Sequence, residues 1–104
     1  SWDIVVCDPP AFAKKRGDLR AAARGYQDVN RLAMSLVAPG GWLLTCSCSH
    51  HIDESLFRTI MFHASRQARR SARILGRHIQ AADHPVHICH PETEYLKSFL
   101  LWVE

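Results

Sequence analysis

The sequence predicts an α/β fold in which helices pack against a mostly parallel β-sheet. Short apolar segments rich in β-branched residues alternate along the chain with segments whose apolar residues recur at helical spacing. Polar residues with distinctive chemistry directly follow the first two apolar segments, and ligands of parallel sheets bind beyond the carboxyl ends of strands. A chain of 104 residues can form one small domain or part of a larger one.

The first half of the chain predicts a strand, a loop and a helix. Residues 3–7 are apolar and β-branched, and a strand cannot continue through the Asp8-Pro9-Pro10 that follows. Residues 11–27 are small, basic and polar, which predicts a loop with no more than one helical turn. Apolar side chains at helical spacing then predict a helix over residues 28–37, which Pro39-Gly40-Gly41 ends.

The remaining elements follow in the order strand, helix, strand, strand. They cover residues 42–46, Glu54 to about Arg70, 72–80 and 98–103, with loops over residues 47–51 and 84–95. Asp53 can cap the helix, and its apolar stripe consists of Leu56, Ile60, Met61 and Ala64. Both strands of the first pair, 3–7 and 42–46, read as buried.

The composition indicates a globular protein of a reducing compartment. The chain is 47% hydrophobic and 22% charged, and its formal charge of +3 permits a nucleic acid partner without requiring one. It has no apolar run of the roughly 18 residues that a membrane span needs, and no signal peptide. Cys7, Cys46, Cys48 and Cys89 do not form the dense pattern of a disulfide framework, which favours the cytoplasm.

The segment after the first strand could hold a nucleobase. Asp8 lies at a strand end, Pro9 and Pro10 stiffen the chain, and the Asp8 carboxylate or nearby carbonyls can accept hydrogen bonds from an exocyclic amine. Phe12 can offer a flat face on which a base stacks. A plain strand end, with Asp8 capping local amides, explains the same residues equally well.

The segment after the second strand could supply a nucleophile. Cys48 lies between two serines and before His50 and His51, and such neighbours can favour the thiolate form of a partly exposed cysteine. Simple packing is the alternative, and it suits Cys46 better because Cys46 lies within the strand. Zinc binding by these residues with Cys89 and His90 is a weaker alternative, since Cys-x-Cys is not a usual ligand spacing.

Basic residues follow the first candidate segment. They are Lys14, Lys15, Arg16, Arg20 and Arg24. They could contact the phosphates of a nucleic acid, or they could form an ordinary solvated charge run.

Six segments taken together resemble one known family. They are, in order, Asp8-Pro9-Pro10-Ala11-Phe12, Arg24-Gly25-Tyr26-Gln27-Asp28-Val29-Asn30, Pro39-Gly40-Gly41, Thr45-Cys46-Ser47-Cys48-Ser49, Ala81-Ala82-Asp83-His84-Pro85 and Tyr95-Leu96-Lys97-Ser98-Phe99. On these motifs the whole chain resembles the C-terminal half of the catalytic domain of the bacterial 23S ribosomal RNA 5-methylcytosine methyltransferase I family. Asp-Pro-Pro alone is common among methyltransferases, whereas the other segments together are more specific.

The resemblance implies a Rossmann-like class I methyltransferase fold, whose last strand is antiparallel to the others. It implies S-adenosyl-L-methionine as cofactor, ribosomal RNA as substrate, and methylation of cytosine C5 by a covalent cysteine mechanism in the cytoplasm. The family's nucleophile falls on Cys48. Its base-contacting motif falls on Asp8, Pro9 and Pro10, and Asp8 and Pro9 would also border the cofactor.

Two departures from the family pattern limit what the resemblance implies. Many RNA 5-cytosine methyltransferases carry a second cysteine that helps to release the product, and Pro10 and Ala11 occupy that stretch here. The glycine-rich loop and the acidic residue that bind the cofactor in class I folds are absent from residues 1–104. We therefore expect a partial methyltransferase domain, lacking its N-terminal cofactor-binding half and inactive alone. Its open strand edge at Ile4–Cys7 predicts a homodimer.

Three other functions compete with a cytosine-C5 methyltransferase. A methyltransferase acting on an exocyclic base amine uses a similar Asp-Pro-Pro motif and needs no cysteine. A non-catalytic RNA-binding module would use the basic loop alone. A small zinc protein would bind metal through the cysteines and histidines.

Overall fold

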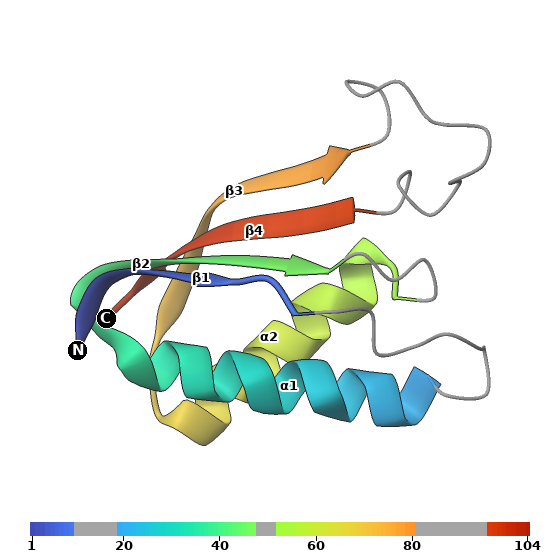
Figure 1. Cartoon of the computed structure of the whole chain (residues 1–104), viewed down its shortest axis with the longest axis horizontal. Helices are drawn as coiled ribbons and strands as arrows, with labels where there is room; N and C mark the ends of the chain where they lie inside the picture. Colours follow the sequence, from blue (N-terminus) through green and yellow to red (C-terminus); the bar gives the residue numbers. More distant parts are fainter. Residues whose placement is uncertain (10–18, 48–51, 81–95) are drawn as a thin grey trace.

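The described residues of the protein form six regular elements, in the order that the sequence predicts. In the computed structural model they are β1 (Trp2–Cys7), α1 (Leu19–Leu36), β2 (Val37–Ser47), α2 (Glu54–Ala68), β3 (Ala72–Gln80) and β4 (Leu96–Val103) (Figure 1). The structure describes residues 1–9, 19–47, 52–80 and 96–104. The predicted loop over residues 84–95 lies outside these residues.

The described strands form one mixed sheet in the order β1-β2-β4-β3. β1 and β2 pair in parallel, whereas β4 pairs antiparallel with both of its neighbours. β1, β2 and β3 therefore run in one direction and β4 runs in the other (Figure 1). The predicted antiparallel last strand is confirmed.

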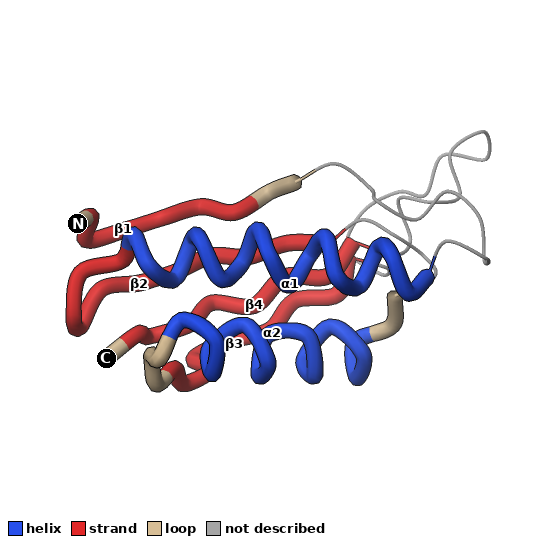
Figure 2. The backbone as a smooth tube through the Cα atoms, turned by 90° about the horizontal axis from the view of Figure 1, so that it is seen from below, coloured by secondary structure: helices blue, strands red, loops and turns tan. Residues whose placement is uncertain are grey.

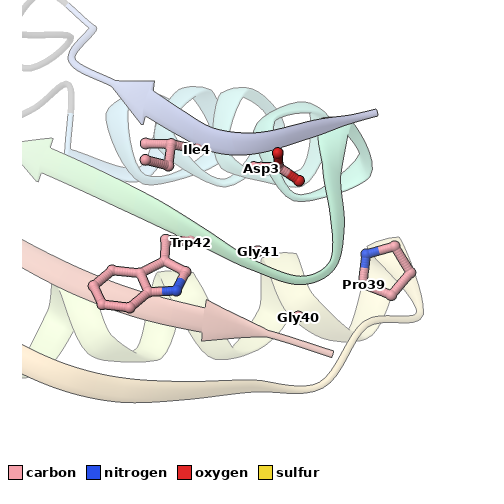
Figure 3. A pocket seen from close by; sticks show the side chains of 6 residues that line it. All are labelled: Asp3, Ile4, Pro39, Gly40, Gly41 and Trp42. Carbon is pink, nitrogen blue, oxygen red and sulfur yellow. The ribbon is translucent and has the colours of Figure 1, made fainter.

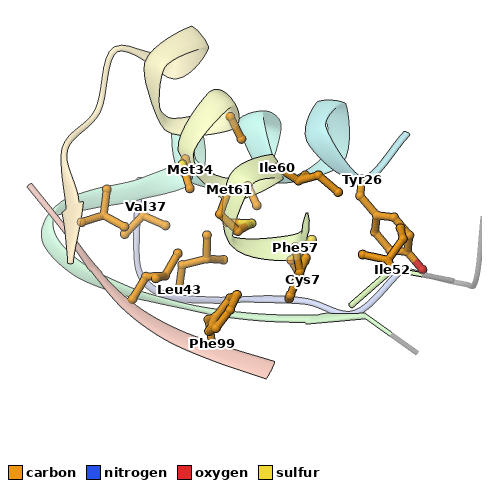
Figure 4. Close-up of a cluster of buried hydrophobic side chains, with 14 of the residues drawn as sticks. Cys7, Tyr26, Met34, Val37, Leu43, Ile52, Phe57, Ile60, Met61 and Phe99 are labelled. Carbon is orange, nitrogen blue, oxygen red and sulfur yellow. The ribbon is translucent and has the colours of Figure 1, made fainter. Parts of the chain in front are cut away.

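Both described helices cover the same face of the sheet (Figure 2). Their apolar side chains meet those of β2 and β4 in one core, where the Phe57 and Phe99 rings stack with centroids 5.0 Å apart (Figure 4). The other face is open: the exposed fractions are 70% for Ile4, 62% for Val6 and 45% for Trp42. The prediction that residues 3–7 and 42–46 are buried strands is thus wrong for one face of each, because no described helix covers it.

The first helix begins at Leu19, whereas the sequence predicted a loop as far as residue 27. Alanines favour a helix, and the three at positions 21–23 offset the cost of Gly25, which is about 1 kcal/mol. Ala22 and Tyr26 are buried and extend the apolar stripe by two turns toward the N-terminus. Arg24 therefore lies exposed on α1 and not in a basic loop.

The second strand begins at Val37 and so includes Pro39-Gly40-Gly41, which were predicted to lie between the helix and the strand. Near the start of β2, Gly40 adopts a positive φ of 81°, which glycine tolerates because it has no Cβ. At Gly41 the backbones of β1 and β2 come very close, and an added Cβ would lie 2.8 Å from the Asp3 carbonyl oxygen. Glycine is thus required where the two strand backbones approach each other this closely.

The second helix has the predicted N-cap. The Asp53 carboxylate accepts a hydrogen bond of 2.8 Å from the Leu56 amide. The apolar stripe includes Phe57, which the sequence prediction omitted, and the Phe57 ring also makes an edge contact with Tyr26. This contact joins α2 to α1.

Arg70, which follows α2, joins α1, β2 and the C-terminal Glu104 through hydrogen bonds. Arg70 Nη1 donates hydrogen bonds of 2.8 Å to the carbonyls of Met34 and Val37, and Nε donates one of 2.7 Å to the Glu104 carbonyl. The first two carbonyls belong to the C-terminal end of α1 and the start of β2, where helical partners run out. Arg70 therefore caps α1 from a distant part of the chain.

Candidate functional site

The carboxyl ends of β1 and β2 lie side by side. Cys7 pairs in parallel register with Thr45, so Asp8, which follows β1, lies at the same sheet edge as Ser47, which ends β2. This is the edge at which parallel sheets bind ligands. The sequence prediction that the two motifs follow neighbouring strands is confirmed for the described residues.

A groove of about 360 Å³ runs along β1 and α1 and includes this end of β1. Asp8 and Pro9 line it, together with apolar side chains such as Val29 and Leu32 of α1. Asp8 is exposed and Pro9 is half-buried. An apolar groove bordered by a carboxylate can hold a flat, partly polar ligand such as a nucleobase.

A buried polar cluster lies behind this edge. Thr45 donates a hydrogen bond to the Asn30 side-chain oxygen, and Asn30 Nδ2 donates one of 2.7 Å to the Tyr26 carbonyl. Thr45 also hydrogen-bonds with the side chain of Cys7 on β1. Asn30 and Thr45 are fully buried, and neither was singled out from the sequence. The available signal was an asparagine at a core position of α1 and a threonine inside an apolar strand.

The environment of Cys7 keeps its thiol protonated. Burial raises the pKa of the Cys7 thiol, the Thr45 hydrogen bond lowers it, and the negative charge of Asp8 raises it, with a net increase. A buried thiol with a raised pKa is a poor nucleophile. We therefore assign Cys7 a role in core packing at the carboxyl end of β1 and not a role as nucleophile.

A lysine at the same edge was also missed from the sequence. Lys97 is 5% exposed and pairs with Ser47, the last residue of β2. Burying a lysine is costly without a partner, and both Lys97 and Ser47 interact with other groups. No local pattern signalled Lys97, because it lies just before the strand predicted over residues 98–103 and is followed by Ser98.

The predicted site residues fall partly inside the described structure. Asp8 and Pro9 border the groove, whereas Arg24 lies on α1 and does not line it. Pro10, Phe12, Lys14 and Cys48 lie outside the described residues, and so does most of the alternative zinc site. Within the described ranges, no three His, Cys, Asp or Glu side chains are grouped to hold a metal ion.

A second hollow of about 390 Å³ lies near the opposite end of β1 and β2 (Figure 3). Asp3, Ile4 and Trp42 border it, with the Pro39-Gly40-Gly41 segment. It contains none of the predicted site residues. Of the helices that the structure describes, neither is long and apolar enough to span a membrane.

The fold is that of methyltransferases. Two solved structures superimpose on 96% of the chain at 18% sequence identity, with TM-scores of 0.71 and 0.70. One is SMU.776, provisionally assigned as a methyltransferase and solved in complex with SAH, and the other is a provisionally assigned SAM-dependent methyltransferase from Streptococcus mutans. The chain covers about a quarter of each. No protein-family model matches the chain.

The sequence relatives carry one specific name. Ribosomal RNA large subunit methyltransferase I of Vibrio vulnificus is 48% identical over 98 residues, which is 94% of this chain and 25% of that protein. The protein of the same name from Photobacterium profundum is 46% identical over 99% of this chain and 26% of its own length. This chain is thus homologous to a segment of ribosomal RNA large subunit methyltransferase I, as the motifs indicated, and spans about a quarter of those relatives.

Proposed function

We propose that the chain is part of an S-adenosylmethionine-dependent ribosomal RNA methyltransferase that modifies cytosine C5 through a covalent bond to Cys48. One observation carries the proposal: relatives named ribosomal RNA large subunit methyltransferase I align with almost the whole chain at close to half identity. The placement of Asp8 beside the end of β2, whose next residue in the sequence is Cys48, supports it. The reaction takes place in the cytoplasm.

The proposed chemistry explains why the reaction needs a cysteine nucleophile. Cytosine C5 is too weak a carbon nucleophile to accept a methyl group unaided. The Cys48 thiolate adds to C6, which gives C5 enamine character. C5 then takes the electrophilic methyl group that S-adenosylmethionine supplies, and S-adenosylhomocysteine leaves with the electron pair of the broken S–CH3 bond. Loss of the C5 proton then allows the C6–S bond to break, which regenerates the thiolate and leaves 5-methylcytosine.

The remaining predicted residues hold the substrate in this proposal. Asp8 accepts a hydrogen bond from the exocyclic amine at the base edge and so holds the ring in position for the Cys48 thiolate. Pro9 and Pro10 fix the direction of the chain beside it, and Phe12 stacks on the base, which has left its own stack. Lys14 and Arg24 contact phosphates. Arg24 is exposed on α1, which suits such a contact.

The residues of this chain fit one side of a cofactor site. Asp8 and Pro9 line an apolar groove large enough for part of a bound small molecule. Because the chain spans about a quarter of its relatives, we propose that the glycine-rich loop and the ribose-binding carboxylate lie in another part of the full-length polypeptide. The 104 residues alone then bind the cofactor weakly and are inactive.

The isolated chain further dimerises through β1 in this proposal. Among the described strands β1 pairs only with β2, which leaves its second edge open, and Ile4 and Val6 expose apolar surface beside that edge. Sedimentation velocity should show a dimer that Ile4→Lys dissociates, whereas Leu75→Lys on exposed β3 should leave it intact. A monomer at high concentration would exclude this arrangement.

The test of the proposed reaction traps its covalent intermediate. The full-length polypeptide is incubated with S-adenosylmethionine and RNA containing 5-fluorocytosine, in which fluorine replaces the proton that must leave. We expect a protein–RNA adduct that survives denaturation. It should disappear in Cys48→Ala and persist in Cys46→Ala, the matched control within β2.

Two other outcomes would contradict the proposal. Methylation without an adduct, unchanged in Cys48→Ala, would indicate transfer to an exocyclic amine. RNA binding without any methyl transfer would indicate a binding module.

A further inference from the structure

The buried polar cluster behind the candidate site joins three elements. Asn30 belongs to α1, Thr45 to β2 and Cys7 to β1, and the side-chain contacts between them run in one chain. Asn30 is further tied to its own helix through the Tyr26 carbonyl. The cluster thus connects α1 to the two strands whose ends carry the candidate site.

The polar cluster occurs at only one end of the described packing between α1 and the sheet. Toward the other end of the same helix, its packing against the sheet is apolar, with Met34 and Val37 fully buried. A pair of apolar side chains stabilises a core at least as well as a buried hydrogen-bonded pair does. A directional hydrogen bond, however, permits only one alignment of its partners, whereas apolar contacts permit small shifts. Polar residues therefore occur at the end where alignment matters for a ligand.

We propose that Asn30 and Thr45 are positioning residues: their buried hydrogen bond fixes α1 against the end of β2, and the pairing of Thr45 with Cys7 extends this alignment to the end of β1 at the candidate site. Thr45 is two residues from Ser47, which ends β2, and its partner across the sheet, Cys7, directly precedes Asp8. A Thr45 side chain fixed by Asn30 thereby keeps its partner Cys7, and with it Asp8, in register with the end of β2. For catalysis the inference rests on the proposed function, in which Asp8 and Cys48 act on one base.

The experiment separates positioning from stability with a pair of variants in the full-length polypeptide. Thr45→Val alone leaves the Asn30 side chain without its buried donor and should lower the melting temperature. The double variant Asn30→Leu/Thr45→Val replaces both partners by apolar groups and should recover the melting temperature. Thr45→Ser keeps the hydroxyl, and Ser35→Ala removes an exposed side-chain bond on the same helix as a control.

We expect the double variant to react more slowly than the wild type even though its melting temperature is restored. Its rate of adduct formation and its kcat should fall about 10- to 100-fold, because small misplacements of reacting groups have costs of this size. Its KM for RNA should stay within about twofold, since the phosphate contacts are untouched. Thr45→Ser should recover the rate. A double variant that regains both melting temperature and wild-type kcat would overturn the inference.

A second readout keeps the inference testable if the proposed function fails. Hydrogen–deuterium exchange of the Cys7 and Ser47 amides reports the alignment of the strand ends without any reaction. We expect faster exchange there in the double variant and unchanged exchange at Leu43. Unchanged exchange at the strand ends would refute the positioning role, whether or not the wild-type protein methylates RNA.

Discussion

Replacing Gly41 by alanine should destabilise the protein strongly, because the close approach of the β1 and β2 backbones leaves no room for a Cβ. The added atom would lie 2.8 Å from the Asp3 carbonyl oxygen, 2.9 Å from the Ala38 carbonyl oxygen and 2.8 Å from Val37 Cγ1. Two of these neighbours are backbone atoms, one in β1 and one in β2 itself, so relief requires shifts both of β1 and of the start of β2. Overpacking that side chains can relieve costs about 1–3 kcal/mol, and a clash with two backbones should reach the upper end or exceed it.

Gly76 on β3 provides the matched control. A Cβ at Gly76 would meet no atom within 4 Å, and its φ is not positive. Gly76→Ala should therefore stabilise the protein by about 0.4–1 kcal/mol through the lower entropy of the unfolded chain. The two substitutions are chemically identical, so they differ only in the space around each site.

Urea unfolding followed by tryptophan fluorescence measures both variants. The chain has three tryptophans, and Trp42 directly follows Gly41. The free energy of unfolding should fall for Gly41→Ala and rise for Gly76→Ala, with m-values close to that of the wild type. Equal stability of the two variants would refute the reasoning from the close approach of the β1 and β2 backbones at Gly41.

Three further predictions concern single side chains. Arg70→Met should lower the free energy of unfolding by about 2–4 kcal/mol in urea, since it removes three hydrogen bonds from a cation, and Arg70→Lys should recover less than half. Asp53→Ala should cost about 1 kcal/mol and Asp53→Asn far less, as measured by thermal melting; equal losses would exclude a capping role. The pKa of Cys7 is raised in the folded protein, so the folded state holds its proton more tightly than the unfolded state does. Stability should therefore fall as the pH rises past about 8.5, the unfolded pKa, and Cys7→Ala should reduce that fall in unfolding measurements across pH.

The sequence predicted the order of the elements because each carries a local signal. A β-branched run marked β1, an apolar run marked β2, and Asp53 marked the start of α2. The start of α1 was misplaced because basic residues and Gly25 conceal the helical stripe that Ala22 and Tyr26 continue. The open face of the sheet could not be predicted, since a strand's sequence does not show how many of its faces a helix covers.

The candidate site was predictable only where its residues follow strands directly. Asp8 lies at the end of β1 as expected, because two prolines stop the strand there. The hydrogen bond between Asn30 and Thr45 joins residues 15 positions apart. It depends on the packing of α1 against β2, which no local pattern specifies. Lys97 likewise reveals its burial only through its pairing with Ser47.

The place of β4 in the sheet has a consequence for the order in which the protein can assemble during synthesis. β4 lies between β2 and β3, although it follows both of them in the sequence. Chains grow on the ribosome at about 5–20 residues per second, so β2 and β3 are synthesised before β4, the strand that pairs with both of them. The sheet therefore stays in two parts until residues 96–103 emerge, and a nascent chain stopped before them would present two unpaired strand edges to chaperones and proteases.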